Sequence, residues 1–403
     1  MSASLAAPTG IHPVAVHAFT ATCALGPGVD PLAAALAANR SGLRPNDLPG
    51  VPLPCAIGRV DGVETLPWPT AWQAWDSRAT RLAWLGLQAD GFIDAVSAAR
   101  QRHGAARVGL VLGTSASTIA VSEAAYRQLD AQGRFPEPVR HPRLNTPHSI
   151  TAFVQQALGL DGPALTVSTA CSSSAKALAV AERWLRLGLV DAVVAAGVDA
   201  LGGSLLYGFQ SLGLLGSEPC RPFDAGRKGI SIGEAAAYAL LQRGPGELQL
   251  VGHGESNDAH HMSSPHPQGL GAERALSDAL ARAGLTAEAI DFVNLHGTAS
   301  AANDEVEAAL VARRYAPSVH ACATKGLTGH TMGAAGLLEA VIALLALQRG
   351  VLAGSAPTLQ ADAGLGEAFG TRWRAMPARR RIGTAASHSF GFGGNNCVVV
   401  FAC

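Results

Sequence analysis

Residues 165–174 read Leu-Thr-Val-Ser-Thr-Ala-Cys-Ser-Ser-Ser, a β-branched stretch that passes through small residues into a helix-like pattern. A strand that leads directly into a helix is the repeating unit of α/β proteins, and Cys171 stands at the junction. Unpaired N–H groups and the helix dipole favour a thiolate there, so the segment predicts a nucleophile. A small buried apolar side chain is the alternative for a free cysteine.

Strand-like and helix-like segments alternate on both sides of Cys171, and this alternation predicts an α/β fold with mostly parallel sheets. The pattern restarts after the connector 244–246. We therefore divide the chain into residues 1–245, which carry the cysteine, and residues 246–403. The predicted strands are 108–112, 164–168, 192–196, 247–251, 292–295 and 397–401, and the predicted helices are 149–158, 172–187, 272–283 and 334–347.

Composition limits the classes of partner. The 403 residues include 30 Lys+Arg and 30 Asp+Glu, and this balance argues against a nucleic-acid or anionic-membrane partner. The most apolar run, 334–347, contains Glu339, which argues against a membrane span. The first 19 residues contain no Lys or Arg, and the seven cysteines lack CxxC spacing. These features predict an unexported, cytoplasmic protein with reduced thiols.

Two histidines occupy junctions similar to that of Cys171. His296 ends a predicted strand, and His330 follows a strand-like stretch and precedes a predicted helix. Because active sites of α/β proteins form at the carboxyl edge of the sheet, we expect the three side chains to meet there. Together they would supply a nucleophile and two proton or hydrogen-bond donors. Taken singly, each histidine also fits a structural role.

The segment SHSFGFGGNN, residues 387–396, precedes the last predicted strand. Its glycines free the backbone to turn amide groups toward an oxyanion. An ordinary glycine turn is the alternative for this segment alone.

Four motifs together resemble the β-ketoacyl-acyl-carrier-protein synthases, the two-histidine condensing enzymes, over about residues 105–403. The motifs are VSTACSSS at Cys171, HGTASAAND at His296, TKGLTGHTMGAAG with Lys325 and His330, and SFGFGGNN near the end of the sequence. The resemblance implies a thiolase-like α/β fold, a duplicated five-layer αβαβα arrangement, usually in a dimer. It also implies decarboxylative Claisen condensation of a malonyl carrier thioester with a cysteine-bound acyl chain, in fatty-acid or polyketide biosynthesis.

The resemblance assigns roles to individual residues. Cys171 would accept the acyl group, and His296 and His330 would donate hydrogen bonds to the malonyl thioester carbonyl. Lys325 would order the histidines, and Phe392 would gate the acyl pocket and share an oxyanion hole with the Cys171 amide. The remaining implied residues are Thr298, Ser300 and Ser263 at the phosphopantetheine arm, and Glu339 and Asp304 as structural support. The resemblance implies no metal and no cofactor beyond the carrier's phosphopantetheine.

The implied partners are an acidic acyl carrier protein and a second subunit, either a copy of this chain or a chain-length-factor-like protein. Arg78 and Arg81 are a candidate docking pair for the carrier. The stretch GISIGEAA, residues 229–236, resembles pathway-specific synthases of the aryl-polyene or xanthomonadin type. Two residues depart from the family pattern: Lys228 replaces an acidic residue, and Asn395 replaces a threonine. The acyl chain length and the starter are not specified by the sequence.

Other assignments fit less well. A thiolase would need a second cysteine in residues 387–396, a chain-length factor would lack the nucleophile, and an unrelated cysteine hydrolase would use one histidine with an acidic or amide partner. The histidines 253, 260, 261 and 266 suggest a metal site only weakly.

Overall fold

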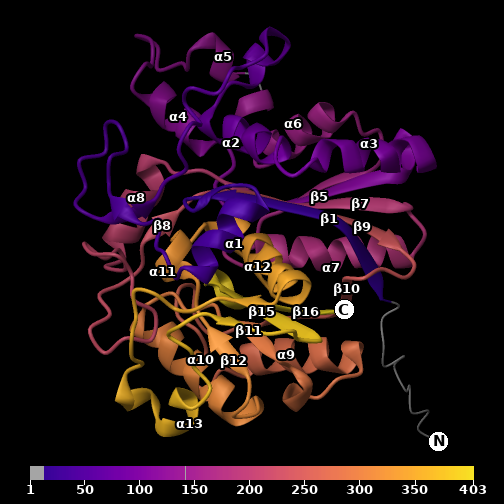
Figure 1. Ribbon diagram of the computed structural model, residues 1–403. Coiled ribbons are helices and arrows are strands. Elements are labelled where there is room, and N and C mark those ends of the chain that lie inside the picture. The colour runs from indigo at the N-terminus through magenta and orange to yellow at the C-terminus, as the bar shows by residue number, and fades with distance from the viewer. Residues whose placement is uncertain (1–12, 141) are drawn as a thin grey trace, which may run out of the picture.

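The computed structural model describes residues 13–140 and 142–403, so residues 1–12, part of the segment considered for export, lie outside it. Figure 1 shows five layers, in which helices alternate with two β-sheets. This is the predicted duplicated αβαβα arrangement.

The first sheet is mixed, with the strand order β2-β1-β9-β7-β5-β6. The central β7 pairs in parallel with β5, whereas β9 runs antiparallel to both β7 and β1. The prediction of mostly parallel pairing is therefore wrong, because β1 and β9 were not recognised as strands. The strands are β1 (Val14–Cys23), β2 (Gly26–Pro27), β5 (Val108–Gly113), β6 (Ala164–Val167), β7 (Ala192–Asp199) and β9 (Ala235–Arg243).

The second sheet repeats this pattern with the order β10-β16-β15-β11-β12. Here β15, β11 and β12 are parallel, and β16 runs antiparallel between β15 and β10. Strand for strand, the order matches β1-β9-β7-β5-β6 of the first sheet. The strands are β10 (Gln249–Asn257), β11 (Phe292–Asn294), β12 (His320–Cys322), β15 (Thr384–Gly391) and β16 (Asn395–Ala402).

Helices form the other three layers (Figure 1). The outer layer on the first sheet contains α2 (Arg78–Leu87), α3 (Phe92–His103) and α6 (Ser149–Leu158). The middle layer contains α1 (Val29–Ala37), α7 (Ser173–Arg186) and α12 (Ala335–Arg349), and the outer layer on the second sheet contains α9 (Leu270–Ala283) and α10 (Ala301–Arg314). Shorter elements are α4 (Ile119–Tyr126), α5 (Glu137–Arg140), α8 (Gly203–Ser211), α11 (Lys325–Thr328), α13 (Glu367–Gly370), β3 (Arg44–Pro45), β4 (Ala56–Gly58), β8 (Ile232–Gly233), β13 (Val351–Leu352) and β14 (Ala378–Arg379).

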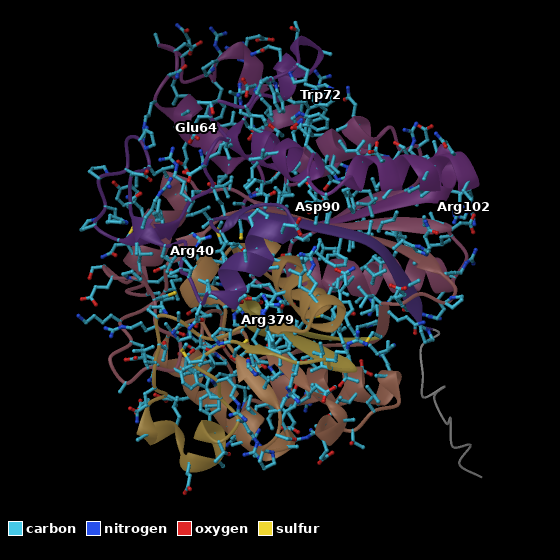
Figure 2. All side chains as sticks on the ribbon, viewed as in Figure 1. Arg40, Glu64, Trp72, Asp90, Arg102 and Arg379 are labelled. Carbon is cyan, nitrogen blue, oxygen red and sulfur yellow. The ribbon has the colours of Figure 1, made fainter. Side chains whose placement is uncertain are left out.

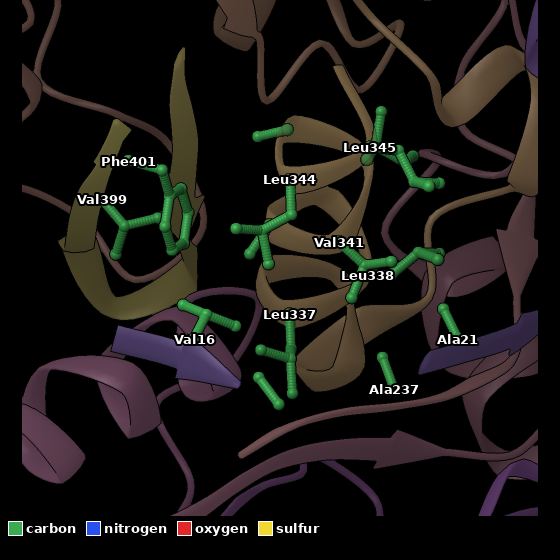
Figure 3. Packing of buried hydrophobic residues seen from close by; sticks show 14 of the residues in the cluster. Val16, Ala21, Ala237, Leu337, Leu338, Val341, Leu344, Leu345, Val399 and Phe401 are labelled. Atoms are coloured by element: carbon green, nitrogen blue, oxygen red, sulfur yellow. The ribbon is translucent and has the colours of Figure 1, made fainter. Parts of the chain in front are cut away.

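Both sheets pack against α12, which is apolar on nearly all sides. Figure 3 shows Leu344 of this helix beside Val399 and Phe401 of β16, and Val341 and Leu338 on the side of Ala21 of β1 and Ala237 of β9. The segment Met332–Arg349 is long and apolar enough to cross a membrane, but 89% of it is buried inside the fold. A helix that is hydrophobic all round is typical of the core of a large protein. We therefore assign it to the core.

The duplicated topology places four turns at matching ends of strands. The turn after β6 leads into α7, and the turn after β12 leads through α11 into α12. The other two turns follow β11, which is the neighbour of β12, and β15, which is the next strand beyond β11. These turns carry all of the predicted reacting groups.

Candidate active site

Cys171 lies in the turn between β6 and α7, and its side chain is buried. Ala170 before it has a φ of +53°, a conformation that is unfavourable for a residue with a Cβ. Two hydrogen bonds hold this turn, because Ser173 Oγ donates to the Ala170 carbonyl (2.5 Å) and accepts from the Thr169 N–H (2.9 Å). The sulfur is thus fixed at the start of the central helix.

The two predicted histidines meet Cys171 as expected. His330 Nε2 lies 3.0 Å from Cys171 Sγ. Side-chain donor atoms of Cys171, His296 and His330 all lie within 4.8 Å of one another, and the two rings are nearly perpendicular, with centroids 5.4 Å apart. The three side chains line a cavity of about 490 Å³. This cluster is the catalytic triad.

The hydrogen-bond partners of the two rings fix their tautomers. His330 Nδ1 accepts from the Met332 N–H (3.2 Å), and His296 Nδ1 faces the Lys325 ammonium (3.3 Å). Each histidine therefore carries its proton on Nε2. Burial, reinforced by the charge of Lys325, lowers the pKa of both rings well below the usual value. The site presents two neutral N–H donors.

The same tautomers are unsuited to metal binding. A histidine that binds a metal through Nε2 normally donates its Nδ1–H to an acceptor, whereas both Nδ1 atoms here face donors. The other predicted histidine group brings only two rings together, those of His260 and His266, whose centroids are 5.1 Å apart. His253 is buried against Glu182 (Nε2 to Oε2, 3.1 Å), while His260 and His261 are exposed.

Lys325 connects His296 to Glu339 inside the core. Its Nζ donates to the His296 carbonyl (2.5 Å) and to Glu339 Oε1 (2.5 Å), and both charged side chains are almost fully buried. Burial raises the pKa of Glu339 to about 7, although the Lys325 charge opposes that rise. The lysine thus holds the turn and the ring of His296 together.

The expected resting thiolate is not supported. Burial raises the pKa of Cys171 to about 11, against the Lys325 charge and the backbone N–H groups of Phe392 and Cys171. Desolvation of the buried sulfur outweighs the effect of the start of α7 and therefore favours the thiol form. The two amides that face it are the pair expected to form an oxyanion hole.

The cavity also brings together the residues predicted to bind the carrier arm. Thr298, Ser300 and Ser263 all line it, and Thr298 Oγ1 lies 2.9 Å from Ser300 Oγ. Phe392 lines the same cavity and packs against Phe209 of α8, with ring centroids 5.9 Å apart. The sequence analysis did not identify Phe209. It lies in α8, far from Phe392 in the sequence, and only the folded chain brings the two rings together.

The two departures from the family pattern lie in different environments. Lys228 lines the cavity, has an exposed side chain and pairs with Glu218 (2.8 Å). Asn395 instead accepts a hydrogen bond from Lys176 of α7 (3.2 Å). Lys228 therefore adds a positive charge where the cavity meets solvent.

Asp304 lies beneath the turn that follows His296. Its carboxylate accepts from the backbone N–H groups of Phe223 (2.7 Å) and Ala299 (3.2 Å), and Ala299 has a φ of +67°. Burial raises the pKa of Asp304 to about 7. A second buried carboxylate, Asp199, was not predicted, and it accepts from the Gly333 N–H (2.7 Å) just after His330.

The proposed docking pair is already engaged within the protein. Arg78 donates to the buried Glu234 (Nε to Oε2, 2.8 Å) and pairs with Glu64, which Figure 2 labels. Arg81 pairs with Asp76 (Nη2 to Oδ2, 2.8 Å). The prediction of a free basic docking pair is therefore not supported, because both guanidinium groups hold α2 in place.

Comparisons with known proteins agree with this geometry. Residues 79–245 match the N-terminal domain of β-ketoacyl synthases, and residues 248–359 match the C-terminal domain. The chain is 34% identical to nodulation protein E of Rhizobium meliloti (strain 1021) over 309 residues, 74% of this chain and 76% of that protein. It is 32% identical to the mitochondrial 3-oxoacyl-[acyl-carrier-protein] synthase of Arabidopsis thaliana over 322 residues, 73% and 68% of the two chains.

Solved structures give the same result. A ketosynthase from Xenorhabdus doucetiae, determined in complex with its chain length factor, superposes with a TM-score of 0.87 at 34% identity, over 97% of this chain and 98% of that chain. The ishigamide ketosynthase/chain length factor superposes with a TM-score of 0.85 at 25% identity, over 98% and 99% of the two chains. With the Cys-His-His cluster in place, the chain belongs to the β-ketoacyl synthase family.

Proposed function

We propose that this ketosynthase is the catalytic subunit of a pathway-specific heterodimer, paired with a chain-length-factor-like protein and served by an acyl carrier protein. Its reaction is the condensation of a 3-oxoacyl-ACP synthase. The observation that carries the function is the buried cluster of one thiol and two neutral imidazole donors on the wall of a cavity, which the hydroxyls predicted to bind the carrier arm also line.

In the first half-reaction, the Cys171 sulfur attacks the acyl carrier thioester. The acyl group moves to the sulfur, and the thiol proton leaves with the pantetheine thiol. The amides of Cys171 and Phe392 would stabilise the oxyanion of the tetrahedral intermediate. Losing one such donor typically costs on the order of 100-fold in rate.

In the second half-reaction, the bond between the malonyl carboxylate and its α-carbon breaks, and carbon dioxide leaves. The electron pair forms an enolate, whose oxygen accepts hydrogen bonds from the Nε2–H groups of His296 and His330. The enolate carbon then attacks the acyl carbonyl, the bond to the Cys171 sulfur breaks, and the released thiolate takes a proton from solvent to return to the thiol. Two neutral donors suit this step because they stabilise the developing negative charge without giving up their protons.

The heterodimer rests on three observations. β6 is an edge strand of the first sheet and leaves Leu165 40% exposed, so the described residues provide no neighbour for this edge. Two similar solved ketosynthases pair with chain length factors. The sequence GISIGEAA at 229–236 favours the aryl-polyene or xanthomonadin-type subgroup. A cytoplasmic location agrees with seven cysteines that are all free.

Reconstitution tests this proposal. The chain is incubated with acyl carrier and malonyl carrier, alone and with a candidate chain-length-factor-like subunit, and products are followed by mass spectrometry while light scattering gives the oligomeric state. Elongation only in the mixed complex is the expected result. An active homodimer that ignores the second subunit would exclude the heterodimer, and elongation by a Cys171→Ala variant would exclude the catalytic assignment.

A further inference from the structure

The turn that carries His296 rests on a buried carboxylate that the sequence analysis left without a role. Glu307 of α10 accepts from the His296 N–H through Oε1 (2.8 Å) and from the Gly297 N–H through Oε2 (2.8 Å). Gly297 has a φ of +40°, and a Cβ there would lie 2.5 Å from Ala323 Cβ. The backbone of this turn therefore has little room to move, because Glu307 holds its two N–H groups and Ala323 packs closely against Gly297.

Two further side chains stand behind Glu307. His388 of β15 directs Nδ1 at Glu307 Oε1 (3.0 Å), and its Nε2 lies 2.7 Å from the Tyr315 hydroxyl. The carboxylate can only accept, so His388 donates its Nδ1–H, and Nε2 accepts from the Tyr315 O–H. All three side chains are almost completely buried. They form one continuous chain of hydrogen bonds that ends at the His296 backbone.

His388 also reaches His296 through an aromatic contact. The Phe390 ring lies between them, with centroids 5.1 Å from His388 and 6.0 Å from His296, and Phe390 lines the catalytic cavity. His296 thus has two separate supports. Lys325 fixes the ring at Nδ1. Glu307 fixes the backbone and Phe390 packs against the ring, and His388 contacts both Glu307 and Phe390.

We propose that His388, backed by Tyr315, is a positioning residue that sets the aim of the His296 donor by holding Glu307 against the His296–Gly297 turn. His330 is held separately. The backbone N–H of His330 donates to the Ser231 carbonyl (2.7 Å), and its ring Nδ1 accepts from the backbone N–H of Met332. The chain from Tyr315 to Glu307 therefore acts on one of the two enolate donors.

This asymmetry makes the effect specific to one step. Acyl transfer to Cys171 uses the sulfur and the two amides, none of which contacts His388. Decarboxylation needs both histidines aimed at the enolate oxygen, and a misplacement of the order of 1 Å can cost up to about 100-fold in rate. Loss of His388 should slow decarboxylation and condensation while leaving acyl transfer unchanged.

Three variants of the full-length protein test the proposal. His388→Leu removes both hydrogen bonds, His388→Gln keeps a donor and an acceptor, and Tyr315→Phe removes one hydroxyl. Acyl transfer from an acyl carrier to Cys171 and decarboxylation of a malonyl carrier are measured separately by mass spectrometry. His320→Leu is the matched control, because His320 is also buried in the second sheet but, among the described residues, its ring has a hydrogen bond only with the Ala353 carbonyl (2.7 Å).

We expect His388→Leu to slow decarboxylation about tenfold, His388→Gln to restore most of that rate, and Tyr315→Phe to give a smaller loss, with acyl transfer within about twofold of the parent in each case. His320→Leu should change both half-reactions equally or not at all. Equal losses in both half-reactions for the His388 variants, or undiminished decarboxylation, would overturn the proposal. If His388→Leu does not fold, Tyr315→Phe decides by the same two rates.

Discussion

His330 Nε2 lies 3.0 Å from Cys171 Sγ although 159 residues separate the two in sequence. Each residue precedes the middle-layer helix of its own sheet, α7 for Cys171 and α12 for His330. The duplicated topology therefore brings the nucleophile of the first half onto a donor of the second. Neither half holds a complete reaction centre.

Replacing the nucleophile should separate the two half-reactions. Cys171→Ala is expected to lower condensation by more than about 1,000-fold, because no sulfur remains to carry the acyl chain. Malonyl decarboxylation should continue, since His296 keeps Lys325 at Nδ1 and His330 keeps the Met332 N–H at Nδ1, although His330 Nε2 loses its contact with the sulfur. Mass spectrometry of both carriers measures the two activities, and full elongation by this variant would contradict the assignment of the nucleophile.

The Phe392 ring should control access of the acyl chain. It packs against Phe209, and the Gly393 N–H beside it donates to the Met262 carbonyl (2.7 Å). We expect Phe392→Ala to change the acyl-transfer rate several-fold and to alter the distribution of chain lengths, with Phe209→Ala acting in the same direction. Unchanged rates and an unchanged product profile for Phe392→Ala would exclude a gate.

The buried Lys325–Glu339 pair should be strongly coupled. Lys325→Met leaves a carboxyl group without its cation, and breaking one side of a buried pair typically costs about 3–5 kcal/mol of unfolding free energy. Adding Glu339→Gln to that variant should recover part of the loss, because the uncompensated charge disappears. Urea unfolding of the four proteins in this double-mutant cycle measures the coupling, and additive single effects would argue against it.

His320 should make the protein less stable in mild acid. Burial lowers the pKa of His320 to about 4, whereas an unfolded histidine titrates near 6.5. Its contribution to stability is therefore complete above pH 6.5 and is lost as the pH falls from 6.5 toward 4, by up to about 3 kcal/mol. The unfolding free energy of His320→Gln should depend less steeply on pH across that interval. An identical pH dependence in the variant and the parent would contradict this assignment.

The local sequence was enough to predict the turn of Cys171 and both histidine junctions. At each position, a short apolar stretch passes into small residues and then a helix, and these features involve neighbours in sequence. The predicted helix 149–158 coincides with α6, and the predicted helix 334–347 differs from α12 by one or two residues at each end.

Three long strands, each of eight residues or more, escaped prediction for identifiable reasons. β9 reads AAAYALLQR, and alanine favours helices unless tertiary packing decides otherwise. β15 contains polar and small residues whose side chains are buried, so it lacks the apolar alternation of an exposed strand. β1 lies in the N-terminal region, where no periodic pattern was recognised. Missing β1 and β9 hid the antiparallel pairs β1–β9 and β9–β7, and this led to the incorrect prediction of mostly parallel pairing in the first sheet.

The residues that position the reacting groups were harder to predict from the sequence than the reacting groups themselves. Glu307 contacts residues 10 and 11 positions away, but His388 reaches Glu307 across 81 positions and Tyr315 across 73. Only the folded chain brings these three side chains together. The pKa of Cys171 was likewise misjudged, since the sequence shows the start of the helix but not the depth of burial.

The middle helical layer makes the two halves inseparable. One continuous apolar cluster contains Leu178 of α7, Leu337 of α12, Leu241 of β9 and Val399 of β16, so both halves share the core of the middle layer, although each sheet also has an apolar cluster on its outer side. Cutting the connector at Gly244 would leave two fragments that stay associated through this shared layer. Each fragment made alone would expose an apolar face and aggregate, whereas co-expression of the two would restore a working enzyme by complementation.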